Sequence, residues 1–113
     1  MRIDKYRFGK IVIDGDIYTN DLIILPDRII TNWWRNEGHI FDLGDCPQIF
    51  AAEPEFVIFG LGAYSLVKLS PALIRELEIK GIQFQALPTE AACDLFNRKS
   101  SQLKTAAAMH LTC

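Results

Sequence analysis

The sequence has no hydrophobic run of the length that a membrane-spanning helix requires. Such a helix takes about 20 consecutive apolar residues, and charged or turn-forming residues interrupt every apolar stretch of this chain before that length. The first residues are polar, and they resemble neither a secretory signal nor an Arg- and Ser-rich mitochondrial presequence. We therefore expect a cytoplasmic protein that does not insert into membranes.

Cysteine is scarce, and its three copies form no obvious pattern. Cys46, Cys93 and Cys113 are widely spaced and odd in number, which favours reduced thiols. His110 and Cys113 lie close together, but zinc usually takes four ligands and no second pair accompanies them. We expect no metal and no cofactor, while a redox role for Cys93 or Cys113 remains an open alternative.

The charges have no predominant sign. Twelve Lys and Arg against 14 Asp and Glu give a net charge of −2, and no basic block is present. A nucleic-acid partner is disfavoured, because proteins that bind nucleic acids concentrate Lys and Arg on one surface. Half of the residues are hydrophobic, and the chain is long enough to bury a core. We expect one domain over residues 1–113, without internal repeats.

The first third of the chain is typical of β-structure. Asp14-Gly15 is a strong hairpin signal between two alternating segments. Further turns at Asn20-Asp21 and Pro26-Asp27 separate runs of β-branched and aromatic residues. The pattern predicts an antiparallel meander with strands at residues 10–13, 16–19, 22–25 and 28–34.

The middle of the chain predicts a strand, a helix and a second strand. An apolar run at residues 55–59 ends at Gly60-Leu61-Gly62, and Ser70-Pro71 has the residues that begin a helix. Gly81 ends that helix, and residues 82–86 alternate as a strand does. Such short links favour a parallel pair of strands joined by a right-handed crossover.

A second helix is predicted from Glu90 to about Lys99, with Thr89 as its cap. Residues 103–111 fit either a helix, which their alanines favour by propensity, or a strand of small residues between two packed layers. We predict the strand. The fold class is then α/β: a single domain with an N-terminal antiparallel meander and a βαβα unit.

The glycine turn that begins at Gly60 follows a strand, as nucleotide-binding loops do. However, Ser65 stands where the dinucleotide fingerprint has its third glycine, and no Walker lysine follows. A tight structural turn or a small anion site is therefore favoured over a dinucleotide site.

The most unusual cluster is Trp33-Trp34-Arg35, followed by His39. On a strand, adjacent tryptophans face opposite sides, so one is expected in the core and the other in a groove beside Arg35. The alternative is ordinary packing plus a surface arginine. His39 is either an acid–base group, since its charge changes near neutral pH, or a structural histidine.

Several short segments resemble, in this order, the small Mth-type domain family. That family includes an adipogenesis-associated protein and a mitochondrial complex I assembly factor. The resemblance implies a compact α/β domain with a mixed sheet folded on itself and two main helices, and it supports a strand at the C-terminus. It implies no established reaction, and its assembly-factor branch acts by binding protein partners. The segments are Trp34-Arg35, Gly38-His39, Phe59-Gly60-Leu61-Gly62, Lys80-Gly81-Ile82, Pro88-Thr89-Glu90-Ala91-Ala92, Phe96-Asn97 and Met109-His110-Leu111-Thr112-Cys113.

Two functions follow as hypotheses. The first is a non-enzymatic protein-interaction domain, a monomer or small homo-oligomer, in which Trp34→Ala or Arg35→Ala weakens partner binding with little change in melting temperature. The second is a small-molecule or anion-binding domain, an undetected enzyme included, in which the glycine turn supplies N–H donors and Arg35 supplies charge. The candidate binding residues are Trp34, Arg35, His39, Gly60, Gly62 and Thr89.

Overall fold

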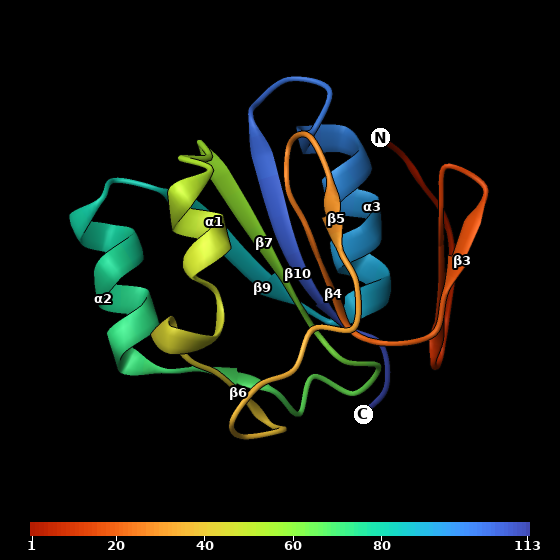
Figure 1. Ribbon diagram of the computed structural model, residues 1–113, viewed down its shortest axis with the longest axis horizontal. Coiled ribbons are helices and arrows are strands. Elements are labelled where there is room, and N and C mark those ends of the chain that lie inside the picture. Colours follow the sequence, from red (N-terminus) through yellow and green to blue (C-terminus); the bar gives the residue numbers. More distant parts are fainter.

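A five-stranded mixed sheet runs through the centre of the computed structural model, which describes residues 1–113 (Figure 1). Strand β10 lies in the middle of this sheet, parallel to β7 and antiparallel to β4. In spatial order the strands are β5 (Ile29–Ile30), β4 (Leu22–Ile24), β10 (Thr105–His110), β7 (Phe56–Leu61) and β9 (Gln83–Leu87).

The N-terminal strands β1 (Ile3–Arg7), β2 (Lys10–Ile13) and β3 (Asp16–Tyr18) form an antiparallel sheet of their own. Asp14 and Gly15 both have positive φ, as a tight hairpin turn requires, so the predicted hairpin is confirmed. The predicted meander, however, divides between two sheets. Strand β4 is fully buried and pairs with β10, whereas β3 lies in the outer sheet.

The predicted parallel pair of strands joined through a helix is confirmed. Strand β7 leads through α2 (Pro71–Ile79) to β9, and the two strands are parallel, with Val57 opposite Phe84. The Ser70 hydroxyl accepts the Leu73 N–H at 3.1 Å and caps α2. A two-stranded parallel sheet of β6 (Ile40–Phe41) and β8 (Lys68–Leu69) lies beside this unit, with the short helices η1 (Leu43–Asp45) and α1 (Pro47–Ala51).

The C-terminal strand is also confirmed, against the helix propensity of its alanines. All six residues of β10 are buried. Ala107 and Met109 face the core formed with α3 (Thr89–Lys99), whereas Ala106 and Ala108 face the core formed with Trp33. Small side chains let packed layers approach the strand from both sides, so tertiary packing decides the conformation.

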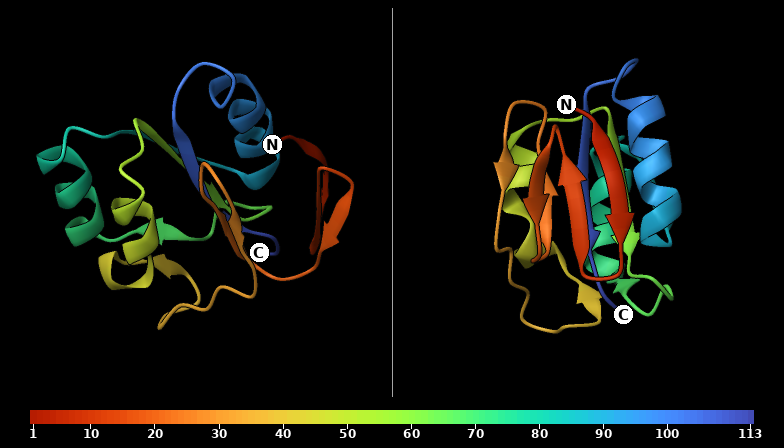
Figure 2. Two further views of the ribbon diagram at one scale, coloured as in Figure 1. Left: turned by 45° about the horizontal axis from the view of Figure 1, so that its top comes forward. Right: turned by 90° about the vertical axis from the view of Figure 1, so that its right-hand side faces the viewer.

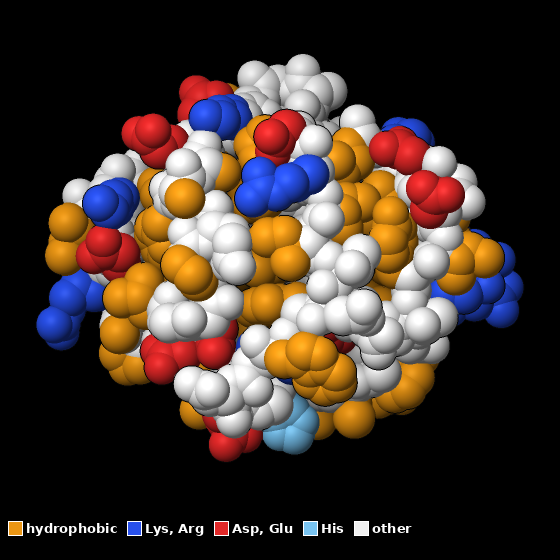
Figure 3. All heavy atoms as spheres, viewed as in Figure 1, with side chains coloured by type: hydrophobic (Ala, Val, Ile, Leu, Met, Phe, Trp, Pro, Cys, Tyr) orange, Lys and Arg blue, Asp and Glu red, His pale blue; other side chains and the backbone are white.

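Helix α3 and the N-terminal sheet cover one face of the central sheet, and α1 and α2 cover the other (Figures 1 and 2). None of the helices has the length and apolar character needed to cross a membrane. On the face drawn in Figure 3, acidic and basic side chains are interspersed.

The predicted strand over residues 28–34 is wrong beyond Ile30. The chain turns at Asn32, whose φ is +52°, and then forms a loop that carries both tryptophans. Trp33 is buried in the core, but the Trp34 side chain is exposed, with 81% of its surface accessible. One tryptophan is therefore in the core as predicted, although both lie in a loop after the Asn32 turn and not on a strand.

Candidate functional site

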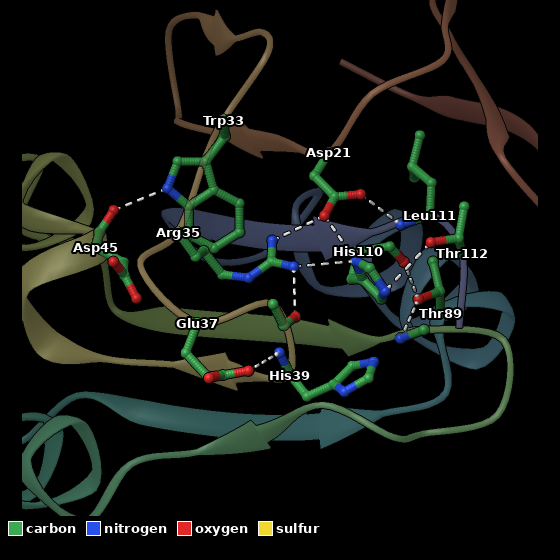
Figure 4. Close-up of polar contacts among 12 residues, drawn as sticks. Asp21, Trp33, Arg35, Glu37, His39, Asp45, Thr89, His110, Leu111 and Thr112 are labelled. Carbon is green, nitrogen blue, oxygen red and sulfur yellow. Dashed lines mark hydrogen bonds and ion pairs between the residues drawn. The ribbon is translucent and has the colours of Figure 1, made fainter.

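The register of two central strands places Asp21 beside His110. Met109 of β10 lies opposite Leu22 of β4, so the next position along this register places His110, the last residue of β10, beside Asp21, which precedes β4. Asp21 Oδ2 lies 2.6 Å from His110 Nδ1, and Oδ1 accepts the Leu111 N–H at 2.8 Å. Residues from opposite ends of the chain thus form one hydrogen-bonded unit (Figure 4).

Arg35 joins this unit from the loop between β5 and β6. Its Nη1 donates to Asp21 Oδ2 at 2.7 Å, and its Nη2 donates to the Gly38 carbonyl at 2.8 Å and also lies 3.2 Å from His110 Nδ1. The guanidinium also lies about 5 Å from the ring centroids of Trp33 and Phe41, a distance at which cation–π attraction operates. Only 5% of the Arg35 side chain is exposed, so the alternative of a surface arginine is wrong.

Asp21 remains a carboxylate despite its partial burial. Burial alone would raise the pKa of Asp21, but hydrogen bonds from His110, Arg35 and the Leu111 N–H outweigh it, and the pKa lies below its ordinary value. A carboxylate accepts hydrogen bonds only, so His110 Nδ1 is the donor in this contact. In the neutral imidazole Nε2 then carries the lone pair.

Gly60, Gly62 and Thr89 hold the strand end that carries His110. The Thr89 hydroxyl donates to the His110 carbonyl at 2.6 Å and accepts the Gly62 N–H at 2.8 Å. A Cβ on Gly60 would lie 2.7 Å from Met109 Sδ and 3.0 Å from Thr89 Oγ1. These glycines allow close approach within the protein, and the Gly62 N–H is not available to a bound anion.

The predicted capping role of Thr89 is wrong. Pro88 occupies the cap position of α3 without a side-chain bond, and Thr89 is the first helical residue. Its hydroxyl instead bonds the N–H of Gly62, just after β7, and the carbonyl of His110 in β10, and local sequence places neither group near Thr89.

A pocket of about 280 Å³ opens beside the network. Trp34 lies on its exposed side, and the Thr112 hydroxyl lies 3.4 Å from His110 Nε2. One N–H of the Asn20 carboxamide donates to Asn32 Oδ1 at 2.8 Å. The lining residues are Thr19, Asn20, Asp21, Trp33, Trp34, Arg35, Gly38, His110 and Thr112.

The six residues predicted from the sequence fall into three groups. Trp34 and Arg35 line the pocket, while Gly60, Gly62 and Thr89 support it from behind His110. His39 is exposed and lies outside the network; its N–H contacts Glu37 and its carbonyl accepts the Lys68 N–H (Figure 4). A binding role for these residues stays a prediction.

The sequence reasoning missed Asp21 and Thr112, and it considered His110 only as a metal ligand. The usable signal was positional: Asp21 immediately precedes a fully apolar strand, and His110 ends the strand that pairs with it in antiparallel orientation. No group of three His, Cys, Asp or Glu side chains is arranged to hold a metal ion.

Comparison with known proteins identifies the family. A family model described as "Protein of unknown function (DUF498/DUF598)" matches residues 3–110. Among curated proteins, none matches the chain.

Solved structures share the fold. The conserved hypothetical protein PH1505 from Pyrococcus horikoshii OT3 is 25% identical over the whole of both chains, with a TM-score of 0.85. MT938 is 22% identical over 99% of this chain and 98% of its own, with a TM-score of 0.81. A Bordetella pertussis protein, described as a Mth938-like domain, is 14% identical over 97% of this chain and 85% of its own, with a TM-score of 0.69. The resemblance to the Mth-type domain family is thereby confirmed.

Proposed function

We propose, from the premise that this chain belongs to the DUF498/DUF598 family of proteins of unknown function, that the pocket beside Trp34 binds a small neutral ligand. The observation that carries the proposal is the Arg35–Asp21 ion pair, 2.7 Å long, in the pocket wall. Because Arg35 and Asp21 neutralise each other, the pocket wall that they form carries no net charge from this pair.

The polar groups around the pocket favour hydroxyl or carbonyl groups on the ligand. Thr19, Asn20 and Thr112 are neutral residues that both donate and accept hydrogen bonds. An anion would need a charged donor that it can reach, yet both terminal nitrogens of Arg35 are bonded to Asp21 and Gly38, and its unpartnered Nε is buried. The Gly62 N–H is bonded to Thr89. These contacts favour the small-molecule half of the second hypothesis over its anion half.

Trp34 supplies the apolar part of the site. An indole that is 81% exposed beside a polar pocket offers a flat apolar face at small cost in side-chain entropy. The ligand class is therefore a small, neutral, planar molecule with carbonyl or hydroxyl groups.

A ligand panel tests this proposal through thermal shift and tryptophan fluorescence. The panel combines neutral aromatic esters, ketones and amides with inorganic phosphate and acetate. Neutral aromatic members should raise the melting temperature and change the fluorescence of the wild type, and Trp34→Ala should abolish both effects. Ile79→Ala is the matched control, because Ile79 is a large exposed side chain of α2 that does not line the pocket. Stabilisation by phosphate alone, or by no member, would contradict the proposal.

A protein partner is the second candidate, and the exposure of Trp34 supports it. Tryptophan is enriched among the residues that dominate binding energy at protein interfaces. Trp34→Ala should then weaken capture of the partner while Ile79→Ala does not. Light scattering of the purified chain would separate a monomer from a small homo-oligomer. A cytoplasmic location and an assembly-factor-like role belong to this second proposal.

A further inference from the structure

We infer that Asp21, His110 and Thr112 form a proton relay that makes the Thr112 hydroxyl a nucleophile toward small neutral esters. The inference rests on the proposed function, since the ester must occupy the pocket beside Trp34. It adds a reaction to that site: acyl transfer to Thr112 followed by hydrolysis.

The contacts run from a nucleophile, Thr112, to a base, His110, and on to an orienting carboxylate, Asp21. Thr112 Oγ1 lies 3.4 Å from His110 Nε2, and His110 Nδ1 lies 2.6 Å from Asp21 Oδ2. Nucleophile–base distances are often longer without substrate than in the reacting complex. With the Nδ1 proton directed at Asp21, Nε2 is the nitrogen that can accept the Thr112 proton.

Each member of the relay is held by a further contact. Asp21 accepts from Arg35 and from the Leu111 N–H, which fixes both carboxylate oxygens. The His110 carbonyl is bonded to Thr89, and the Thr112 carbonyl accepts the Ala63 N–H at 2.8 Å. Such pre-organisation is what catalytic groups require from their surroundings.

Asn20 is the side chain suited to stabilise a developing oxyanion. Asn20 is one of the residues that line the same pocket, and Asn32 accepts one of the two N–H donors of its carboxamide. Amide donors serve in this way in acyl-transfer sites.

The reaction balances without a cofactor. Thr112 Oγ bonds to the acyl carbon while its proton passes to His110 Nε2. The bond from that carbon to the alcohol oxygen then breaks, and the alcohol leaves with the proton from Nε2. Water next attacks the acyl-Thr112 ester, giving its proton to Nε2. Collapse of this second adduct returns the proton to Thr112 Oγ and releases the carboxylic acid.

Hydrolysis of 4-nitrophenyl acetate by the full chain tests the relay. The exposed Cys113 thiol is adjacent to Thr112 and reacts with this ester by itself, so the reference protein carries Cys113→Ser. In that background Thr112→Val should lower the rate at least about tenfold, whereas Thr112→Ser, which keeps the hydroxyl, should retain activity. Mass spectrometry should locate an acetyl group on Thr112.

The variants and the mapping separate catalysis from structure. Thr112→Val keeps the shape of threonine, and its melting temperature is compared with that of the reference. If this variant unfolds, the acetyl mapping and the Thr112→Ser rate still decide the question. An unchanged rate in folded Thr112→Val, or acetylation only at other residues, would overturn the relay.

A ketone separates failure of the relay from failure of the pocket. 4-Nitroacetophenone has no ester bond to break, and its nitroaromatic ring quenches tryptophan fluorescence on contact. Two results together would overturn the relay and still support the neutral-ligand site. The ketone quenches the wild type but not Trp34→Ala, and Thr112→Val hydrolyses the ester as fast as the reference protein does. If neither effect occurs, both proposals fail.

Discussion

Gly62 lies so close to the His110 imidazole that no side chain fits between them. A Cβ at position 62 would lie 2.8 Å from His110 Cδ2 and 2.7 Å from the Thr112 carbonyl oxygen, and the φ of Gly62 is +98°. The backbone just after β7 therefore forms the wall against which the His110 ring is fixed.

This contact predicts that Gly62→Ala is more damaging than another glycine replacement with the same backbone strain. Gly15 also has positive φ, at +85°, but nothing lies within 4 Å of a Cβ built there. We expect Gly15→Ala to lower the free energy of unfolding by about 1–2 kcal/mol through backbone strain alone. Gly62→Ala should cost about 1–3 kcal/mol more, because the added methyl group overpacks the site. Urea unfolding of both variants measures the difference, and equal losses would contradict the proposed wall.

The lowered pKa of Asp21 predicts how stability depends on pH. The charged and polar groups that face it are Arg35, His110 and the Leu111 N–H. Because the folded pKa lies below the ordinary value of 3.8, the ionised carboxylate stabilises the fold above that pH. This contribution should be lost as the pH falls below 3.8 and through the folded pKa.

Asp21→Asn removes the carboxylate and leaves the buried Arg35 without its ionic partner. We expect a loss of about 3–5 kcal/mol near neutral pH, and a flatter dependence of stability on pH below about 4 than in the wild type. Urea unfolding over an acid pH series provides the measurement. Asp27→Asn is the control, because that carboxylate is exposed and its contact with the exposed Arg28 is as long as 3.7 Å. If the free energy of unfolding depends on pH in the same way in the wild type and in Asp21→Asn, the prediction is wrong.

Arg35→Ala should destabilise the protein, whereas Trp34→Ala should leave its stability near that of the wild type. Arg35 is buried against the contacting rings of Trp33 and Phe41 and is paired with Asp21. Its removal leaves a partly buried carboxylate without its ionic partner and should cost about 3–5 kcal/mol. The sequence analysis expects both variants to keep the wild-type melting temperature, and the structure leads us to retain that prediction for Trp34→Ala alone. Arg28→Ala, at an exposed arginine, is the matched control in thermal unfolding. A wild-type melting temperature for Arg35→Ala would show that the pair contributes little.

Features set by neighbouring residues could be predicted from the sequence. The Asp14-Gly15 hairpin, the Ser70 cap and the parallel crossover depend on local turn chemistry and short links, and the structure contains all three. The predicted Thr89 cap is wrong because the role of this side chain depends on residues distant in the sequence. Its hydroxyl is used by Gly62 and by His110, which local patterns do not bring together.

The candidate site depends on strand order, which periodicity does not determine. Asp21 and His110 are 89 residues apart and meet only because β10 enters the sheet between β4 and β7. Arg35 reaches Asp21 and His110 because the loop after β5 returns toward Asp21. The backbone N–H of Trp33 donates to the Asp21 carbonyl at 2.9 Å and holds the loop there. Trp34 and Arg35 were unusual enough to be noticed, but the partners of Arg35 could not be inferred.

The three cysteines should differ sharply in reactivity. Burial, together with the nearby acids Asp45 and Asp42, raises the pKa of Cys46 to about 12. Burial, together with Asp94 and Glu90, does the same for Cys93, whose pKa is also about 12. Cys113 is exposed. Since the thiolate is the reactive form, iodoacetamide at neutral pH should label Cys113 alone in the folded protein.

Peptide mapping after short labelling, with and without urea, checks this prediction. Urea should make all three thiols reactive, because unfolding removes the burial that raises the pKa of Cys46 and Cys93. Cys113→Ser should abolish labelling of the native protein. Rapid native labelling of Cys93 would contradict its burial on the core face of α3 and would revive the redox hypothesis for that thiol. Labelling confined to Cys113 leaves only the C-terminal thiol open to redox chemistry.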